Sequence, residues 1–159
     1  MARTSAGLLM YRRRPGAVEV FLVHPGGPFW AKKDAGAWSI PKGEYLPGDD
    51  PLEAARREFV EETGMEPAGD FAELGAVRQA GGKTVTAWAF EGDCDPAAIR
   101  SNTFTLEWPP RSGKQREFPE VDRAEWFTLD AAEAKIIPGQ VALLHRLAEM
   151  LNGAGAGDD

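Results

Sequence analysis

The sequence predicts a single α/β domain with a mixed β-sheet, and its length and segment order are the main reasons. The chain has 159 residues, of which 43% are hydrophobic, enough for one buried core and short for two. Segments with strand composition lie on both sides of one strongly marked helix, and an amphipathic helix follows them. We expect residues 1–152 to form the domain and residues 153–159 to form a flexible acidic tail.

Strand signals come before and after the central helix. SAGLLMY and VEVFLV, at Ser5–Tyr11 and Val18–Val23, are joined by the turn-rich segment RRRPGA. Four later segments have similar patterns: Glu73–Gln79, Thr84–Phe90, Thr103–Trp108 and Val121–Thr128. Ala131–Lys135 is a short helical candidate, and Gln140–Leu151 has the periodicity of an amphipathic helix.

The central helix has clear start and stop signals. Asp50 is placed to be the N-cap, Pro51 suits the first helical position, and Glu53 completes a D-x-x-E capping box. Gly64 is placed to end the helix. One side of this helix should face the core, because it carries Leu52, Ala55, Phe59 and Thr63.

Composition and charge exclude some classes of partner. The formal net charge of −7 argues against DNA and anionic membranes and disfavours RNA, but it leaves a small anionic substrate open. Cys94 is the only cysteine, so no internal disulfide forms. No apolar run reaches the roughly 20 residues of a membrane span, and the basic residues follow the N-terminal apolar patch, so we expect a cytoplasmic protein.

Three carboxylates crowd the end of the central helix. Glu58, Glu61 and Glu62 fall within an arc of about 100° on a helical wheel, at the edge of the core-facing side. Like charges at this spacing repel, so a solvated acidic face is one interpretation and a divalent-cation site is another. The second gains support from the long Gly- and Pro-rich segment before the helix. Arg57 lies four residues before Glu61, at the spacing of a helical ion pair.

The segment GEYLPGDDPLEAARREFVEETGM, residues 43–65, resembles the Nudix box. That pattern is G-x5-E-x7-R-E-U-x-E-E-x-G-U, where U is a bulky aliphatic residue. Two positions depart from it, since Phe59 is aromatic at the first U and Asp49 replaces the usual glutamate. The remaining fixed positions match through Gly43, Arg57, Glu58, Glu61, Glu62, Gly64 and Met65.

The resemblance implies a Nudix-type α/β/α sandwich and hydrolysis of a nucleoside diphosphate linked to another group, with Mg²⁺ or Mn²⁺ as cofactor. It implies Glu58, Glu62 and the Gly43 carbonyl as metal ligands, and Glu61 as a ligand or the general base. Glu120, from a loop outside the box, is a further candidate for metal or base work, and Arg57 completes the expected catalytic set. For substrate contacts we expect Lys42 and Lys33 at phosphate and Trp30 at a base.

Two enzymatic and two non-enzymatic alternatives remain at the level of the sequence. WSIPKGE, at Trp38–Glu44, resembles the branch of dinucleoside tetraphosphate hydrolases and NTP pyrophosphohydrolases, and an RNA 5′-end pyrophosphohydrolase is a second enzymatic alternative. A Nudix domain that binds nucleotide without catalysis and a structural domain with an acidic helix are the non-enzymatic alternatives. The oligomeric state, monomer or homodimer, is left open.

Overall fold

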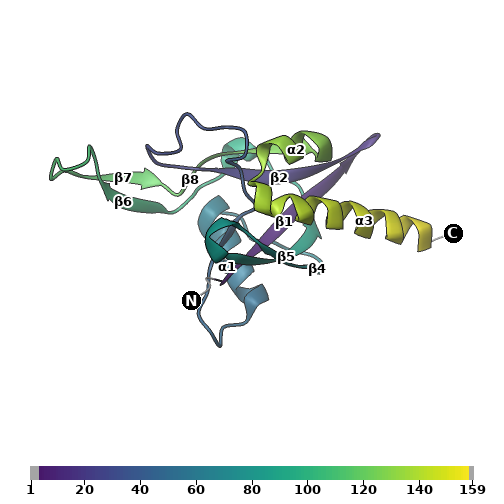
Figure 1. Ribbon diagram of the computed structural model, residues 1–159. Helices are drawn as coiled ribbons and strands as arrows, with labels where there is room; N and C mark the ends of the chain where they lie inside the picture. The colour runs from purple at the N-terminus through teal and green to yellow at the C-terminus, as the bar shows by residue number, and fades with distance from the viewer. Residues whose placement is uncertain (1–3, 158–159) are drawn as a thin grey trace.

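The computed structural model describes residues 4–157, and its centre is a mixed, six-stranded β-sheet (Figure 1). The strands hydrogen-bond in the order β4-β5-β1-β2-β8, and β3 pairs with β1 off this path. The β1 and β5 strands are parallel, whereas the other neighbours in the sheet are antiparallel. Their bounds are β1 Thr4–Arg14, β2 Ala17–Pro25, β3 Lys42–Glu44, β4 Ala72–Arg78, β5 Thr84–Glu91 and β8 Val121–Thr128.

Helices cover both faces of this sheet, which confirms the predicted α/β sandwich with a mixed sheet. Helix α1, Pro51–Thr63, lies on one side, while α2, Leu129–Lys135, and α3, Val141–Gly157, lie on the other (Figure 1). Short 3₁₀ turns connect the elements at Ala80–Gly82, Pro96–Ala98 and Pro138–Gln140. No helix within residues 4–157 is long and apolar enough to cross a membrane.

The central strand β1 supplies both hydrophobic cores. Its residues alternate between the two faces of the sheet, as the period of a strand requires. Leu9 is fully buried in the cluster that contains residues of α3, and Leu8 is fully buried in the cluster that contains Phe59 of α1. An apolar run such as GLLMY is therefore typical of a strand covered on both faces.

Two neighbours share one edge of β1. Residues Tyr11–Arg14 pair with β2, and residues Ser5–Gly7 pair with β3. Between these two pairings, the loop that precedes β3 hydrogen-bonds to the sheet. Leu8 N donates to Pro41 O at 3.1 Å, and Val23 of β2 pairs with Ser39. The loop that carries residues 36–42 is thus fixed against the sheet, where it borders the cavity described below.

A separate hairpin extends from the body of the domain. It consists of β6, Thr103–Glu107, and β7, Gln115–Pro119, and it projects to one side in Figure 1. The sequence predicted a strand at Thr103–Trp108 but neither β7 nor β3, because β7 is polar and β3 has only three residues. Helix α3 continues to Gly157, beyond the predicted end at Leu151, so the expected tail is helical through Gly157; residues 158–159 lie outside the described part of the chain.

The N-cap and the C-terminal stop predicted for α1 are confirmed, but only half of the predicted capping box forms, because the Glu53 carboxylate accepts from Arg56 Nη1 at 3.2 Å and not from Asp50 N. The Asp50 carboxylate accepts a hydrogen bond from Glu53 N at 3.0 Å, and Pro51 begins the helix. Gly64 adopts φ 76°, a left-handed conformation that glycine tolerates, and its N–H donates to Val60 O at 2.7 Å. The helix therefore starts and stops where its own sequence dictates.

Replacing the N-cap should destabilise the domain. We expect Asp50→Ala to lower the free energy of unfolding by about 1 kcal/mol, because the Glu53 N–H loses its acceptor. Urea denaturation measures this change, and Asp70→Ala, which removes an exposed carboxylate outside α1, is the matched control. Equal stability of the two variants would contradict a capping role.

Candidate active site

The site begins where α1 packs on β3. An ideal Cβ at Gly43 would lie 1.8 Å from Glu58 Oε1, so the carboxylate occupies the space that any other side chain at position 43 would fill. Glycine at this position thus allows Glu58 to approach the backbone of β3. Gly43 and Glu58, which are 15 positions apart in the sequence motif, are therefore in direct contact.

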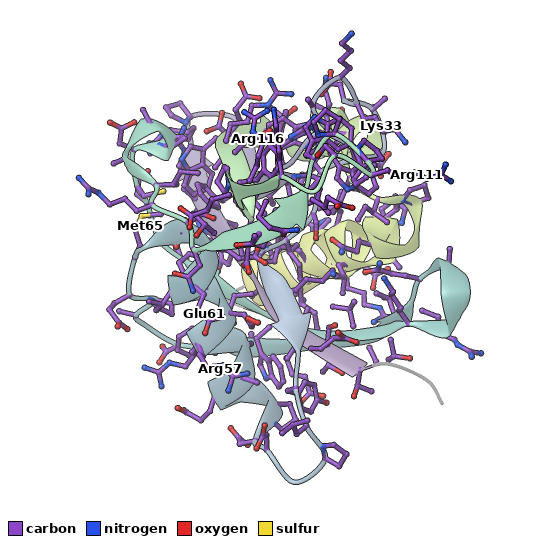
Figure 2. The ribbon with its side chains drawn as sticks, turned by 90° about the vertical axis from the view of Figure 1, so that its left-hand side faces the viewer. Lys33, Arg57, Glu61, Met65, Arg111 and Arg116 are labelled. Atoms are coloured by element: carbon purple, nitrogen blue, oxygen red, sulfur yellow. The ribbon has the colours of Figure 1, made fainter. Side chains whose placement is uncertain are left out.

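Glu58 and Glu61 share a hydrogen bond between their carboxyl groups. Burial raises the pKa of Glu58 to about 7, and the Glu61 carboxyl adds to that rise. Arg57 Nε lies 4.0 Å from Glu61 Oε1, so the predicted i,i+4 ion pair is present at the limit of contact. Figure 2 shows Arg57 and Glu61 along the same side of α1.

Glu62 is directed toward the sheet rather than the solvent. Burial raises its pKa to about 8, against the favourable charge of Lys42 and a hydrogen bond to the Lys42 backbone. The nearby charges of Glu58 and Glu120 raise this pKa further. Burial also lowers the pKa of the Lys42 ammonium, so the pair consists of two partly desolvated groups.

Glu120 joins the cluster from a distant part of the chain. It lies between β7 and β8, where its N–H donates to Asn102 O at 2.8 Å and its carbonyl accepts from Gly26 N at 2.9 Å. Burial and the charge of Glu61 raise its pKa. The structure therefore places Glu120 close enough to the carboxylates of α1 for their charges to act on one another.

This donor set fits a hard divalent cation. Carboxylate and carbonyl oxygens are the ligands that Mg²⁺ prefers, and crowded carboxylates with raised pKa values are stabilised by a cation among them. Within residues 4–157, no three acidic, His or Cys side chains already stand in metal-binding geometry. Glu58 instead contacts Glu61 while Glu62 faces Lys42, so binding would require these carboxylates to turn toward one another.

A cavity of about 390 Å³ adjoins the carboxylates. Glu62, Glu120 and Lys42 belong to its lining. Elsewhere its lining combines apolar residues with polar donors: Val23, Pro25, Trp30, Gly36, Ala37, Ser39, Ile40, Gln79, Lys83, Val121 and Ile137. Its size and mixed lining are typical of a pocket for a small organic ligand.

The predicted substrate residues are distributed unevenly around this cavity. Lys42 lines it beside Glu62, and Trp30 lines it with 40% of its surface exposed. Lys33 does not line it: its Nζ lies 5.1 Å from the centroid of the Trp30 ring, and Figure 2 shows the side chain far from Arg57 and Glu61. Asp49 is exposed, and its carboxylate accepts a hydrogen bond from Leu46 N at 3.2 Å within the loop before α1.

Sequence reasoning missed two polar residues of the cavity, Gln79 and Lys83. Gln79 precedes the turn AGGK and Lys83 is its last residue, and Gln79 N donates to Lys83 O at 2.7 Å. The sequence predicts this turn only as the link between two strands. Its length and glycines predict a tight connection, but no local pattern shows that the connection faces the cavity.

Comparison with known proteins places the chain in a family. The NUDIX domain family matches residues 1–147, and the chain belongs to this family. An RNA pyrophosphohydrolase of Rhizobium meliloti is 30% identical over 116 residues, which is 64% of each chain. One of Brucella anthropi is 32% identical over 118 residues, 64% of this chain and 62% of that protein. The match thus spans less than two thirds of these relatives' length.

Solved structures share the fold at lower identity. A Caenorhabditis elegans Ap4A hydrolase in a binary complex superimposes with a TM-score of 0.67 at 23% identity, covering 96% of this chain and 99% of that one. The NUDIX domain of Shewanella oneidensis NrtR, complexed with ADP ribose, gives 0.64 at 14% identity over 95% of this chain and 89% of that one. At these identities the likeness establishes the fold alone.

The raised pKa values predict that the metal-free protein loses stability as pH rises. Glu58 and Glu62 have pKa values of about 7 and about 8, above the ordinary 4.5, so the folded state binds more protons than the unfolded chain between these limits. The free energy of unfolding should therefore fall from about pH 5 to about pH 8. Thermal melting in EDTA tests this, and Glu62→Gln should flatten the slope. A slope equal in both proteins would contradict it.

Divalent cation should reverse this loss. We expect Mg²⁺ or Mn²⁺ to raise the melting temperature at pH 8, because a ligand at 100 times its Kd stabilises the folded state by about 2.7 kcal/mol. The rise should be smaller at pH 5.5, where protons compete for the carboxylates. Ca²⁺-free buffers with matched ionic strength from NaCl supply the control, and an equal rise with NaCl would exclude a specific site.

Proposed function

We propose that this protein is a divalent-metal-dependent pyrophosphohydrolase that cleaves the diphosphate bridge of a nucleotide. The observation that carries the proposal is the convergence of Glu58, Glu61, Glu62 and Glu120, with raised pKa values for three of them, beside a nucleotide-sized cavity. Membership of the NUDIX family supports this assignment. A solvated acidic face would not be expected to hold partly buried carboxylates with raised pKa values.

In this proposal Glu58, Glu62 and the Gly43 carbonyl hold the cation, with Glu61 as a further ligand. When bound, Mg²⁺ or Mn²⁺ lowers the pKa of water and neutralises charge on the phosphate oxygens. Lys42 lines the cavity beside Glu62, where its ammonium group can contact a phosphate oxygen. Arg57 acts through Glu61, whose carboxylate it orients.

Two carboxylates are candidates for the general base. Glu120 has a raised pKa, which brings it closer to the range in which a carboxylate accepts a proton effectively at neutral pH. Glu61 lies within reach of Arg57, whose Nε is 4.0 Å from Glu61 Oε1. We assign the base to Glu120 and keep Glu61 as the alternative, since both lie in the same cluster.

The substrate class is proposed on chemical grounds. The cavity beside the carboxylates suits a nucleoside with a 5′-polyphosphate, so a dinucleoside polyphosphate or an NTP is the first candidate. An RNA 5′ end is the second candidate, and the RNA pyrophosphohydrolases that match at 30% and 32% identity favour it. Both substrates present the same bridge between phosphates to the carboxylate cluster.

Replacing a proposed metal ligand should abolish hydrolysis without unfolding the protein. We expect Glu62→Gln to lower kcat/KM by roughly 100-fold or more, since loss of even an outer partner of a metal ligand costs about 10- to 100-fold. The measurement is product-resolved hydrolysis of NTPs, dinucleoside polyphosphates and 5′-triphosphorylated RNA in Mg²⁺ and in Mn²⁺. Glu58→Gln should behave in the same way.

Glu53→Gln is the matched control, because Glu53 is an exposed glutamate of the same helix that pairs with Arg56. Its activity should equal that of the unchanged protein. Nucleotide binding without turnover of any diphosphate substrate would refute the enzymatic proposal and favour a non-catalytic binding domain.

A further inference from the structure

A fully buried glutamine sets the polarity of one wall of the cavity. Gln140 has no exposed surface, and its Oε1 accepts a hydrogen bond from Ile40 N at 3.1 Å. A backbone N–H only donates, so the amide atom that faces it must be the oxygen. The Nε2 of Gln140 therefore points the other way, where it donates to Ser39 Oγ and to Gln79 Oε1, each at 2.9 Å.

The rest of the network agrees with this orientation. Ser39 Oγ donates its own hydrogen to Ile40 O at 2.7 Å, so toward Gln140 it can only accept. Reversing the Gln140 amide would place its NH₂ group against the Ile40 N–H, two donors facing each other. The Ile40 N–H thus determines which way the Gln140 amide is oriented.

The orientation of Gln79 follows from that of Gln140. Its Oε1 is engaged with Gln140 Nε2, so its own Nε2 must present donors elsewhere. Among the residues that the structure describes, none accepts a hydrogen bond from Gln79 Nε2. Gln79 lines the cavity while Gln140 does not, so the relay ends in an amide donor at the cavity wall.

The surroundings of Gln79 combine apolar side chains with one lysine. Ala37, Ile40 and Ile137 belong to the same cavity lining as Gln79. Lys83 lines the cavity as well, and its carbonyl accepts a hydrogen bond from Gln79 N at 2.7 Å. An amide donor beside apolar side chains suits a carbonyl oxygen on a flat heterocycle.

We propose that Gln79 is a specificity-determining residue that donates a hydrogen bond from Nε2 to a carbonyl oxygen of the substrate's nucleobase, and that Gln140 is the positioning residue that fixes this polarity. The inference rests on the proposed function, since it assumes that the cavity takes a nucleotide. Guanine presents a carbonyl oxygen at O6 where adenine presents an amino group. The site therefore prefers guanine over adenine nucleotides.

The decisive variant is Gln79→Glu, which keeps the shape and replaces the donor with an acceptor. The readout is the ratio of kcat/KM for GTP to that for ATP, or for the matching dinucleoside polyphosphates, because a ratio cancels any general effect of the added charge. We expect this ratio to fall by at least about fivefold, the lower end of what one buried hydrogen bond contributes to discrimination. The change should fall mainly on KM.

A second variant tests the relay from outside the cavity. In Gln140→Glu, one carboxylate oxygen still accepts from Ile40 N, and the other attracts the Gln79 NH₂ group, which turns the Gln79 oxygen toward the ligand. The GTP-to-ATP ratio should fall in the same direction, although the residue touches no ligand. Gln115→Glu on the exposed strand β7 has the same change of charge and should leave the ratio unchanged.

Binding without turnover separates this inference from the proposed function. Calorimetry with GMP and AMP in EDTA measures base preference independently of hydrolysis, and circular dichroism checks that each variant is folded. A shift of the GMP-to-AMP ratio in Gln79→Glu supports the inference even if no substrate is hydrolysed, an outcome that would refute only the enzyme proposal. An unchanged ratio in Gln79→Glu, or an equal loss for both bases, overturns the inference whether or not hydrolysis occurs. If Gln140→Glu does not fold, Gln79→Glu decides alone.

Discussion

The contact between Glu58 and the backbone at Gly43 is the constraint on which the site depends. A Cβ at position 43 would overlap the Glu58 carboxylate, so helix α1 and strand β3 can approach only because this position has no side chain. The same approach brings Glu62 to the backbone of Lys42 and leaves Glu61 beside Glu58. One missing side chain therefore determines how far three carboxylates lie from the sheet.

Packing on the far side of α1 offsets the repulsion among these carboxylates. Phe59, which lies between Glu58 and Glu61 in the sequence, is fully buried. Its ring centroid lies 6.4 Å from that of Phe21 and 5.5 Å from that of Phe90. Burial of one such side chain contributes about 1.5–3 kcal/mol, several times the roughly 0.2–0.5 kcal/mol that each like-charge pair on a helix costs. The packing of Phe59 therefore outweighs the repulsion along the acidic edge, while burial, followed by the charges of neighbouring carboxylates, raises the pKa of Glu58 and of Glu62.

Two chemically different sets of residues border the cavity. One is ionic, formed by Glu62, Glu120 and Lys42, and the other is the neutral relay from Ile40 through Gln140 to Gln79. A net charge of −7 describes neither, since it averages over a surface on which lysines and amides line a local pocket. The ligand of the cavity is therefore determined by the residues that line it and not by the net charge of the chain.

The sequence by itself determined the features that depend on neighbours along the chain. Asp50, Pro51 and Gly64 define α1 because capping and turn geometry act within a few residues, and the fixed spacing of the box predicted which glutamates share an edge. Only the family resemblance suggested Glu120 as a member of the cluster, and β3 and β7 escaped prediction because short or polar strands form through pairing with distant partners. Only the tertiary structure decided that Lys33 lies outside the cavity lining and that Gln79 meets Gln140, 61 positions away. Hydrogen bonds across such separations depend on how the sheet and helices pack, which no local pattern specifies.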